Sequence, residues 1–227
     1  AGNNNTATLN ISGGTFNAGT TVTKWLHVGY WDTTKGVINI SSGNLNLNTG
    51  SSIKFNRETG TGANVITQTG GNVTFYSDNA TTVGGAGDLD LMLKGAAGSN
   101  NTYNLNGGTL TVPKIVSTTN NGTRTFNFNG GTLKATSSQT AFMNLGTGTA
   151  RANVRNGGAL INTNGYNVTI PQALLHSNIG GDNATDGGLT KSGSGTLTLS
   201  GVNTYNGATA VNGGSLIVTG TGSLATS

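Results

Sequence analysis

The sequence predicts an all-β fold in which short coils of strand stack into a β-solenoid. Three observations lead to this fold class: a composition that disfavours helices, an alternation of apolar and polar residues, and a block with paired glycines that recurs along the chain. Gly, Thr and Asn account for 39, 39 and 32 of the 227 residues, and all three are poor helix formers. Intrinsic disorder is the first alternative for so polar a chain. The presence of only two prolines and the regular spacing of the apolar residues oppose it.

The alternation predicts strands with one buried face and one solvated face. One copy of the block is the segment 103–112 (YNLNGGTLTV), where aliphatic and aromatic residues alternate with Asn and Thr around a glycine pair. The second position of this pair recurs at Gly14, Gly43, Gly71, Gly108, Gly131, Gly158 and Gly214. The spacings are 29, 28, 37, 23, 27 and 56 residues, the last being about two periods. A period near 29 residues predicts a stacked array of about eight coils.

The glycine pairs predict the bends of the coil. Glycine adopts positive φ without the penalty of a Cβ atom, so we expect these seven glycines to form structural corners. A single coil cannot offset the backbone entropy that it loses, and it therefore needs neighbours above and below. In such a stack, equivalent residues lie over one another, which predicts an amide ladder from Asn106, Asn129, Asn156 and Asn212. A β-sandwich, in which strands pair antiparallel with their sequence neighbours, is the rival architecture.

The last part of the chain, residues 187–220, resembles the autotransporter-associated β-strand repeat of bacterial autotransporter passengers and related surface proteins. The likeness rests on the run GLTKSGSGTLTLSG at 188–201, followed by VNTYNGATAVNGGSL at 202–216. The resemblance implies a right-handed parallel β-helix, export through the envelope, and a location that is extracellular or at the outer cell surface. We treat residues 1–227 as a single solenoid domain with its clearest repeat at 187–220.

Composition excludes several classes of partner and cofactor. The net charge of +4 comes from 11 Lys and Arg against 7 Asp and Glu, and the cations are scattered singly, so we expect no nucleic-acid partner. No apolar segment approaches the roughly 18 residues of a membrane-spanning helix. The chain has no cysteine, and its two histidines, His27 and His176, lie 149 residues apart. We therefore expect no metal site and no cofactor, and both histidines are expected at the surface.

A β-helix polysaccharide lyase or hydrolase is the enzyme hypothesis. Such an enzyme needs clustered carboxylates or an acid–base pair at short range. Asp88 and Asp90 lie two residues apart and could share a strand face. The favoured interpretation is that these carboxylates solvate a loop. We therefore predict no catalytic residue.

The segment 25–31 (WLHVGYW) holds both tryptophans of the chain. If its first two aliphatic residues point into the core, the first tryptophan and the histidine must point outward. An exposed tryptophan suggests a contact surface, and the alternative is a tryptophan that covers a corner of the core. The candidate ligand or partner contacts are Trp25, His27, Tyr30 and Trp31.

These observations predict a non-enzymatic structural or adhesive β-solenoid of a secreted or cell-surface bacterial protein. The partners that fit are surface glycans or further copies of the chain, assembled end to end or side by side. A subunit of a self-assembling extracellular fibre is an alternative function, because the ends of a solenoid expose unpaired strand edges. A polysaccharide lyase or hydrolase is the remaining, less favoured alternative.

Overall fold

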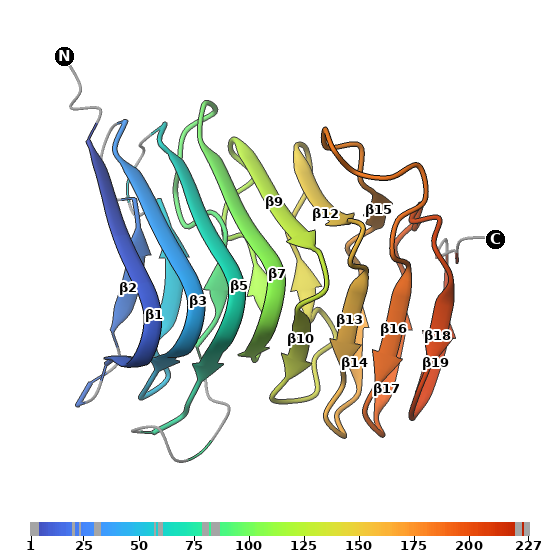
Figure 1. Cartoon of the computed structure of the whole chain (residues 1–227). Coiled ribbons are helices and arrows are strands. Elements are labelled where there is room, and N and C mark those ends of the chain that lie inside the picture. Colours follow the sequence, from blue (N-terminus) through green and yellow to red (C-terminus); the bar gives the residue numbers. More distant parts are fainter. Residues whose placement is uncertain are drawn as a thin grey trace.

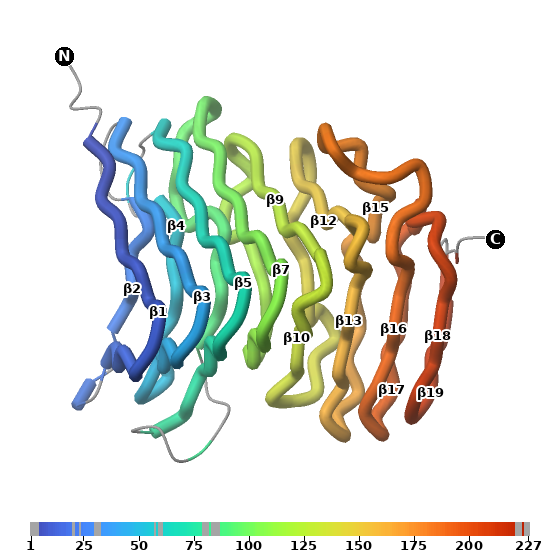
Figure 2. The backbone as a smooth tube through the Cα atoms, in the orientation of Figure 1, coloured from blue at the N-terminus to red at the C-terminus, as the bar shows by residue number. Residues whose placement is uncertain are grey.

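A computed structural model shows parallel strands wound into one elongated stack, with the N-terminal strands in blue at one end and the C-terminal strands in red at the other (Figure 1). The trace of the backbone follows the same progression (Figure 2). The structure describes residues 5–19, 21–22, 24–29, 33–56, 58, 61–78, 82, 87–220 and 224. Within these residues the regular elements are all strands.

The strands of the largest sheet are long in the first half of the chain, with 13 residues each in the first four, and shorter in the second half. In chain order they are β1 (Thr6–Ala18), β2 (Trp25–Val28), β3 (Lys35–Leu47), β4 (Ser52–Phe55), β5 (Ala63–Phe75), β6 (Leu89–Asp90), β7 (Asn100–Val112), β8 (Ile115–Val116), β9 (Thr123–Phe128), β10 (Thr132–Ala135), β11 (Met143–Asn144), β12 (Ala150–Val154), β13 (Ala159–Asn162), β14 (Val168–Ile170), β15 (Leu174–His176), β16 (Leu189–Ser192), β17 (Thr196–Leu199), β18 (Thr209–Val211) and β19 (Ser215–Val218).

Three sheets run along the stack. The largest has the order β1-β3-β5-β7-β10-β13-β16-β18, with β9, β12 and β15 paired beside this path. The second has the order β11-β8-β6-β4-β2, and the third β14-β17-β19. All described strand pairs are parallel. Hairpins of a β-sandwich pair antiparallel, so the predicted all-β parallel β-helix is confirmed, while its right hand and its number of coils stay predictions.

The spacing of the glycine pairs reports the length of the first coils. Strands β1 and β3 pair at an offset of 29 residues, as in the hydrogen bond between Asn39 and Asn10. Strands β3 and β5 pair at an offset of 28 residues, as in the hydrogen bond between Asn72 and Asn44. The next two offsets are 37 residues between β5 and β7 and 23 residues between β7 and β9. Because these four values equal the first four spacings in the sequence, the repeat marks equivalent positions in successive coils.

Apolar side chains fill the interior in layers that follow the coils. Tyr103 and Phe126, one coil apart, stack with ring centroids 5.3 Å apart, and Phe128 lies 4.7 Å from Phe126. The buried hydroxyl of Tyr103 donates to Gln68 Oε1 at 2.7 Å, so the phenol has a partner in the core. Burial raises the pKa of Tyr103 far above its usual value.

The glycine pairs lie where the largest sheet bends. Six of the seven predicted corner glycines have φ between +62° and +76°. In the remaining pair the positive φ, +95°, belongs to Gly130 and not to Gly131. A Cβ atom on Gly108 would lie 2.2 Å from the carbonyl oxygen of Gly71 in the preceding coil. The coils thus approach each other too closely at this bend for a side chain.

Gly214 occupies a different corner from the other six glycines. The glycine stacked next to Gly158 is Gly188, and the strand that follows it, β16, pairs with β18 at an offset of only 20 residues. This coil is short, so a spacing of about two mean periods reaches past the equivalent bend. The next glycine pair therefore lies at the corner between β18 and β19. The expectation that the last glycine spacing spans two periods of one corner is therefore wrong.

The predicted asparagine ladder is confirmed at one step. Asn129 Nδ2 donates to Asn106 Oδ1 at 3.3 Å across one coil. Asn156 instead accepts a hydrogen bond from the backbone N–H of Asn183 at 2.8 Å. The backbone N–H of Asn212 donates to the carbonyl oxygen of Lys191 at 2.8 Å.

A second asparagine ladder lies two or three residues earlier in each coil and is longer. Asn127 donates to Asn104 Oδ1 and accepts from Asn153 Nδ2, both at 2.8 Å, so that three coils are joined through one row of amides. At the N-terminal end, Asn39 donates to Asn10 Oδ1, also at 2.8 Å. Neutral amides therefore hydrogen-bond to one another from coil to coil along the stack, and Asn127 and Asn153 are buried.

Two cations lie inside the stack and bind oxygen atoms of the chain. Arg124 is fully buried and donates to four carbonyl oxygens, those of Asn121, Gly122, Leu145 and Thr147. Lys191, also fully buried, donates to three carbonyl oxygens and to a threonine hydroxyl. Burial lowers the pKa of both side chains. These contacts join neighbouring coils, since Arg124 reaches Thr147 and Lys191 reaches Thr163 and Gly213.

Candidate functional site

Two of the four candidate contact residues, Trp25 and His27, lie on β2, the terminal strand of the second sheet. Trp25 is 50% exposed and Val28 is 1% exposed, so the strand turns the indole toward solvent and the valine toward the core. The rings of Trp25 and His27 meet edge to face with their centroids 5.7 Å apart. The structure thus brings these two predicted residues together. Tyr30 and Trp31 lie outside the described residues.

Trp25 lines a hollow of about 270 Å³ together with Glu58, Leu93 and Lys94, and we call this the Trp25 hollow. Lys94 Nζ lies 3.1 Å from Glu58 Oε2. The ammonium group of Lys54 lies over the indole, 6.0 Å from the ring centroid. The hollow therefore combines an aromatic surface, an aliphatic side chain and a partly exposed ion pair.

The two carboxylates that could form an acid–base pair share one lysine. Lys54 Nζ lies 2.5 Å from Asp88 Oδ1 and 3.5 Å from Asp90 Oδ2. Asp90 is fully buried and accepts hydrogen bonds from the backbone N–H groups of Met92 and Thr118 at 3.0 and 3.1 Å. The interpretation that both carboxylates solvate a loop is wrong. The cause is the pairing of β4 with β6, which places Lys54 directly beside Asp90.

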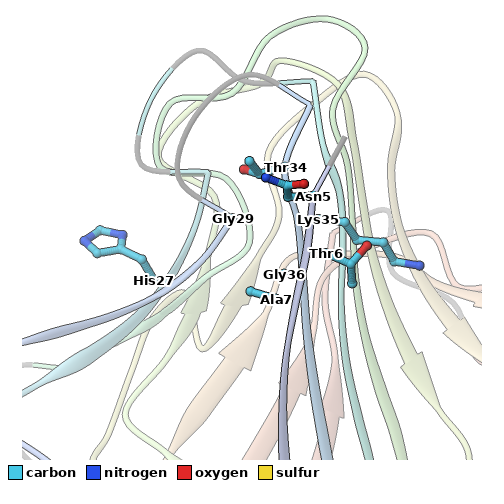
Figure 3. A pocket seen from close by; sticks show the side chains of 8 residues that line it. All are labelled: Asn5, Thr6, Ala7, His27, Gly29, Thr34, Lys35 and Gly36. Atoms are coloured by element: carbon cyan, nitrogen blue, oxygen red, sulfur yellow. The ribbon is translucent and has the colours of Figure 1, made fainter. Parts of the chain in front are cut away.

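A second hollow, of about 340 Å³, lies at the N-terminal end of the stack (Figure 3). It is lined by Asn5, Thr6, Ala7, His27, Gly29, Thr34, Lys35 and Gly36. Its walls are the first described coil and the start of the next, because Lys35 N donates to Asn5 O at 2.9 Å and Ala7 pairs with Gly36. The surface of this hollow is mostly apolar, as expected for the end layer of a solenoid core.

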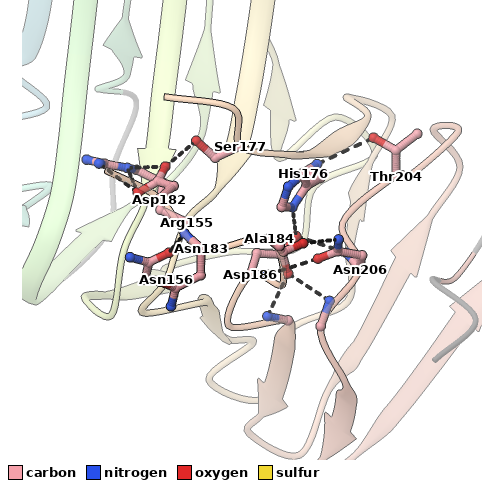
Figure 4. A network of polar contacts seen from close by, with 12 residues as sticks. Arg155, Asn156, His176, Ser177, Asp182, Asn183, Ala184, Asp186, Thr204 and Asn206 are labelled. Carbon is pink, nitrogen blue, oxygen red and sulfur yellow. Dashed lines mark hydrogen bonds and ion pairs between the residues drawn. The ribbon is translucent and has the colours of Figure 1, made fainter. Parts of the chain in front are cut away.

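The ion pair between Arg155 and Asp182 joins the long connection between β15 and β16 to the preceding coil (Figure 4). Arg155 Nη2 lies 2.8 Å from Asp182 Oδ1, and Arg155 Nε lies 2.9 Å from the other carboxylate oxygen. Ser177 Oγ donates to Asp182 Oδ2 at 2.5 Å. The hydrogen bond from Arg155 is the main cause that holds the pKa of Asp182 below its usual value.

His176 is part of the same connection, and its partner is Asp186. His176 Nδ1 lies 2.9 Å from Asp186 Oδ2, and Asp186 also accepts from the backbone N–H groups of Gly188, Asn206 and Gly207. Burial favours a raised pKa for Asp186, but these hydrogen bonds together outweigh it and hold the pKa below its usual value. His176 is partly exposed, and its ring is bound to Asp186.

The described part of the chain holds no group of three or more His, Asp and Glu side chains placed to bind a metal ion. A helix with the length and apolar character needed to cross a bilayer is also absent from these residues. The titratable groups near Trp25 and near His176 are instead bound to one another in pairs. Trp25 and the Lys94–Glu58 ion pair beside it are accessible from the surface for non-covalent contact.

Sequence reasoning missed the partners of Trp25. Lys54 pairs in register with His27 of the preceding coil, so a shift by one coil length points to it. Glu58 and Lys94 lie 36 residues apart, in connections that differ in length. This separation equals the offset at which β4 pairs with β6, a coil longer than the mean period of about 29 residues, so the mean period did not point to the contact.

The comparisons with known proteins identify one part of the stack. Residues 189–218 match the family model described as passenger-associated-transport-repeat. This match begins at the first residue of β16 and ends at the last residue of β19. A search of curated proteins and a search of solved structures each found no match. The resemblance of residues 187–220 to an autotransporter passenger repeat is confirmed.

Proposed function

We propose that this chain is a non-enzymatic structural or adhesive β-helix of an autotransporter-type passenger, displayed outside the bacterial cell. The observation that carries the proposal is the place of the passenger repeat within the stack. β13 pairs with β16 and β14 pairs with β17, so the repeat continues the parallel ladders of the preceding coil. A repeat associated with passenger transport is thus built into the β-helix itself.

The state of the carboxylates supports a non-enzymatic role. Asp88 and Asp90 share one lysine, Asp182 binds an arginine, and Asp186 binds a histidine and three backbone N–H groups. A lyase or hydrolase needs a base or acid that is held near the substrate and free to exchange a proton. These four carboxylates are instead bound to other groups of the fold.

Display is tested by fusing the chain to an outer-membrane translocator barrel in a Gram-negative host. Protease added to intact cells is expected to remove the chain from the surface and to leave a periplasmic reporter uncut. Retention of the whole chain inside the periplasm would contradict the proposal.

The non-enzymatic role is tested with the purified chain and a panel of neutral and acidic polysaccharides, with and without Ca²⁺. No new reducing ends and no unsaturated products are expected. Cleavage that disappears in the variant Asp90→Asn would overturn this part of the proposal.

A subunit of an extracellular fibre is a second candidate function, favoured by apolar side chains at both ends of the stack. Phe16 and Val22 near the first end are 40% and 50% exposed, and Val211 and Ile217 near the other are 47% and 45% exposed. β1 and β18 terminate the path of the same parallel sheet. β18 of one copy can therefore pair with β1 of the next and continue the ladder, a head-to-tail contact that does not close.

The fibre candidate is tested by electron microscopy and sedimentation over a range of protein concentrations. The native chain is expected to form rods that lengthen with concentration. The variant Val211→Lys places a charge on β18, at the contact, and is expected to stay short. Rods of one length at every concentration would exclude the fibre.

A further inference from the structure

The indole of Trp25 is both exposed and held in place. Half of the residue is accessible to solvent. The ring of His27 contacts its edge, and Lys54, itself bound to Asp88, lies over it. A rigid aromatic surface offers a large contact area and loses little conformational freedom when a ligand binds.

Beside the indole lies an ion pair whose two members have opposite hydrogen-bonding roles. Glu58 accepts hydrogen bonds and Lys94 donates them. Their side chains are 23% and 55% exposed, so both remain accessible while bound to each other at 3.1 Å. Two neighbouring hydroxyl groups on a ligand can each find a partner here, one donating to Glu58 and one accepting from Lys94.

Both lysines beside the hollow are paired with carboxylates. Lys94 is paired with Glu58, and Lys54 is paired with Asp88 and Asp90. A site for a phosphate, sulfate or carboxylate group needs donors that are not already neutralised. The pairing of both lysines with carboxylates therefore favours an uncharged ligand over an acidic glycan.

We propose that the Trp25 hollow binds one pyranose unit of a neutral glycan. The C–H face of the sugar ring packs against the indole and Leu93, and its hydroxyl groups bind Glu58 and Lys94. A hollow of about 270 Å³ accommodates a single small ring, whereas a protein partner needs a far larger contact area. The inference names a ligand class for the adhesive role proposed above and rests on that role.

The experiment measures binding of the purified chain to immobilised neutral oligosaccharides of glucose, galactose, mannose and N-acetylglucosamine. A sialylated and a sulfated set serve as the acidic counterparts. The variants are Trp25→Ala, Trp25→Phe and Glu58→Gln. The matched control is Tyr166→Ala, which removes a partly exposed aromatic ring (37% exposed) in the turn between β13 and β14. Far-ultraviolet circular dichroism and thermal unfolding check the fold of each variant.

The native chain is expected to bind at least one neutral oligosaccharide. Trp25→Ala should weaken this binding by about tenfold or more, and Trp25→Phe by less, because it keeps an aromatic face. Glu58→Gln should weaken binding severalfold without loss of stability, which keeps the test decisive if Trp25→Ala fails to fold. Tyr166→Ala should bind as the native chain does.

Three results would overturn the inference: no binding to any neutral oligosaccharide, binding that survives both Trp25→Ala and Glu58→Gln, or a preference for the acidic sets. Self-association that requires Trp25 in the absence of glycan binding would assign the hollow to a second copy and would also overturn it. Because the assay uses purified protein, these outcomes are distinct from a failure of surface display.

Discussion

The close stacking of the glycine pairs leads to a quantitative prediction at Gly108. Its φ is +68°, and a Cβ atom there would lie 2.2 Å from the carbonyl oxygen of Gly71 and 2.6 Å from the backbone of Gly70. Alanine at such a φ costs about 1–2 kcal/mol. To relieve the contact, the coils must separate by roughly 1 Å, and overpacking of this kind costs about 1–3 kcal/mol. We therefore expect Gly108→Ala to destabilise the fold by about 3 kcal/mol.

Gly130 provides the matched control in the next coil of the same stack. Its φ of +95° is also positive, but the nearest atom to a Cβ atom placed there is 3.7 Å away, in Gly157. Gly130→Ala should therefore cost only the backbone contribution, about 1–2 kcal/mol. The difference between the two variants, about 1–2 kcal/mol, reports the approach of adjacent coils.

The assay is native-state hydrogen exchange of the amides in β7 and β9, supported by urea unfolding. Exchange is the main readout because a stacked repeat can unfold in parts, and a single free energy of unfolding then averages over coils. In Gly108→Ala, protection is expected to fall most in β7 and in the strands beside it. Equal loss of protection in the two variants would show that φ alone matters and would refute the argument from coil contact.

Three further predictions follow from the polar interior and exterior. Arg124→Met should lower the free energy of unfolding in urea by about 3 kcal/mol, because buried carbonyl oxygens lose their donor. The control, Arg151→Met, replaces an exposed arginine and should change this free energy little. Equal effects of the two variants would contradict the argument. The pKa of Asp182 is lowered in the folded protein, so its stabilisation is complete above the ordinary value of 3.8 and is lost as the pH falls through the folded-state pKa. Protection of the amides in the connection before β16, corrected for the intrinsic exchange rate, should fall in acid, and Asp182→Asn should reduce this pH dependence to the part that Asp186 contributes. Asn127→Asp should cost about 1 kcal/mol at pH 7, since the ladder loses a donor, while Asn10→Asp keeps the acceptor role of that side chain and should leave thermal unfolding unchanged.

The sequence predicted the architecture because the glycine repeat and the contacts between coils both arise from the close stacking of equivalent bends. Close approach at the bend demands glycine at positions such as Gly71 and Gly108, and the coil length sets the spacing between them. The position of Gly214 could not be predicted in the same way. The short last coil moved its glycine pair to another corner, and a spacing of about two periods looks the same whichever corner is occupied.

The candidate site was predicted only in part. The alternation along β2 pointed to Trp25 and His27, which are neighbours on one strand face. Glu58 and Lys94 come from connections in later coils, and connections vary in length without disturbing the strands. The mean period therefore predicts contacts between equivalent positions where coils have the usual length, and it misses those of a longer coil such as this one, whose offset is 36 residues.

The pairing of His176 with Asp186 illustrates the same limit. The two residues are ten positions apart, in a connection that replaces the tight bend of the earlier coils. Nothing in the residue spacing distinguishes such a connection from a solvated loop. Its ion pairs with the neighbouring coils become visible only when the coils are stacked.

The rows of amide side chains have a consequence for the conditions that the molecule can tolerate. Mobile ions weaken attractions between exposed charges over a Debye length of about 10 Å at 0.1 M salt, but they act weakly on bonds between uncharged amides. Asn104, Asn127 and Asn153 are joined by such bonds. A row of amides built in this way keeps its cohesion at low and at high ionic strength, which suits a protein exposed to a medium whose ionic strength the cell does not control.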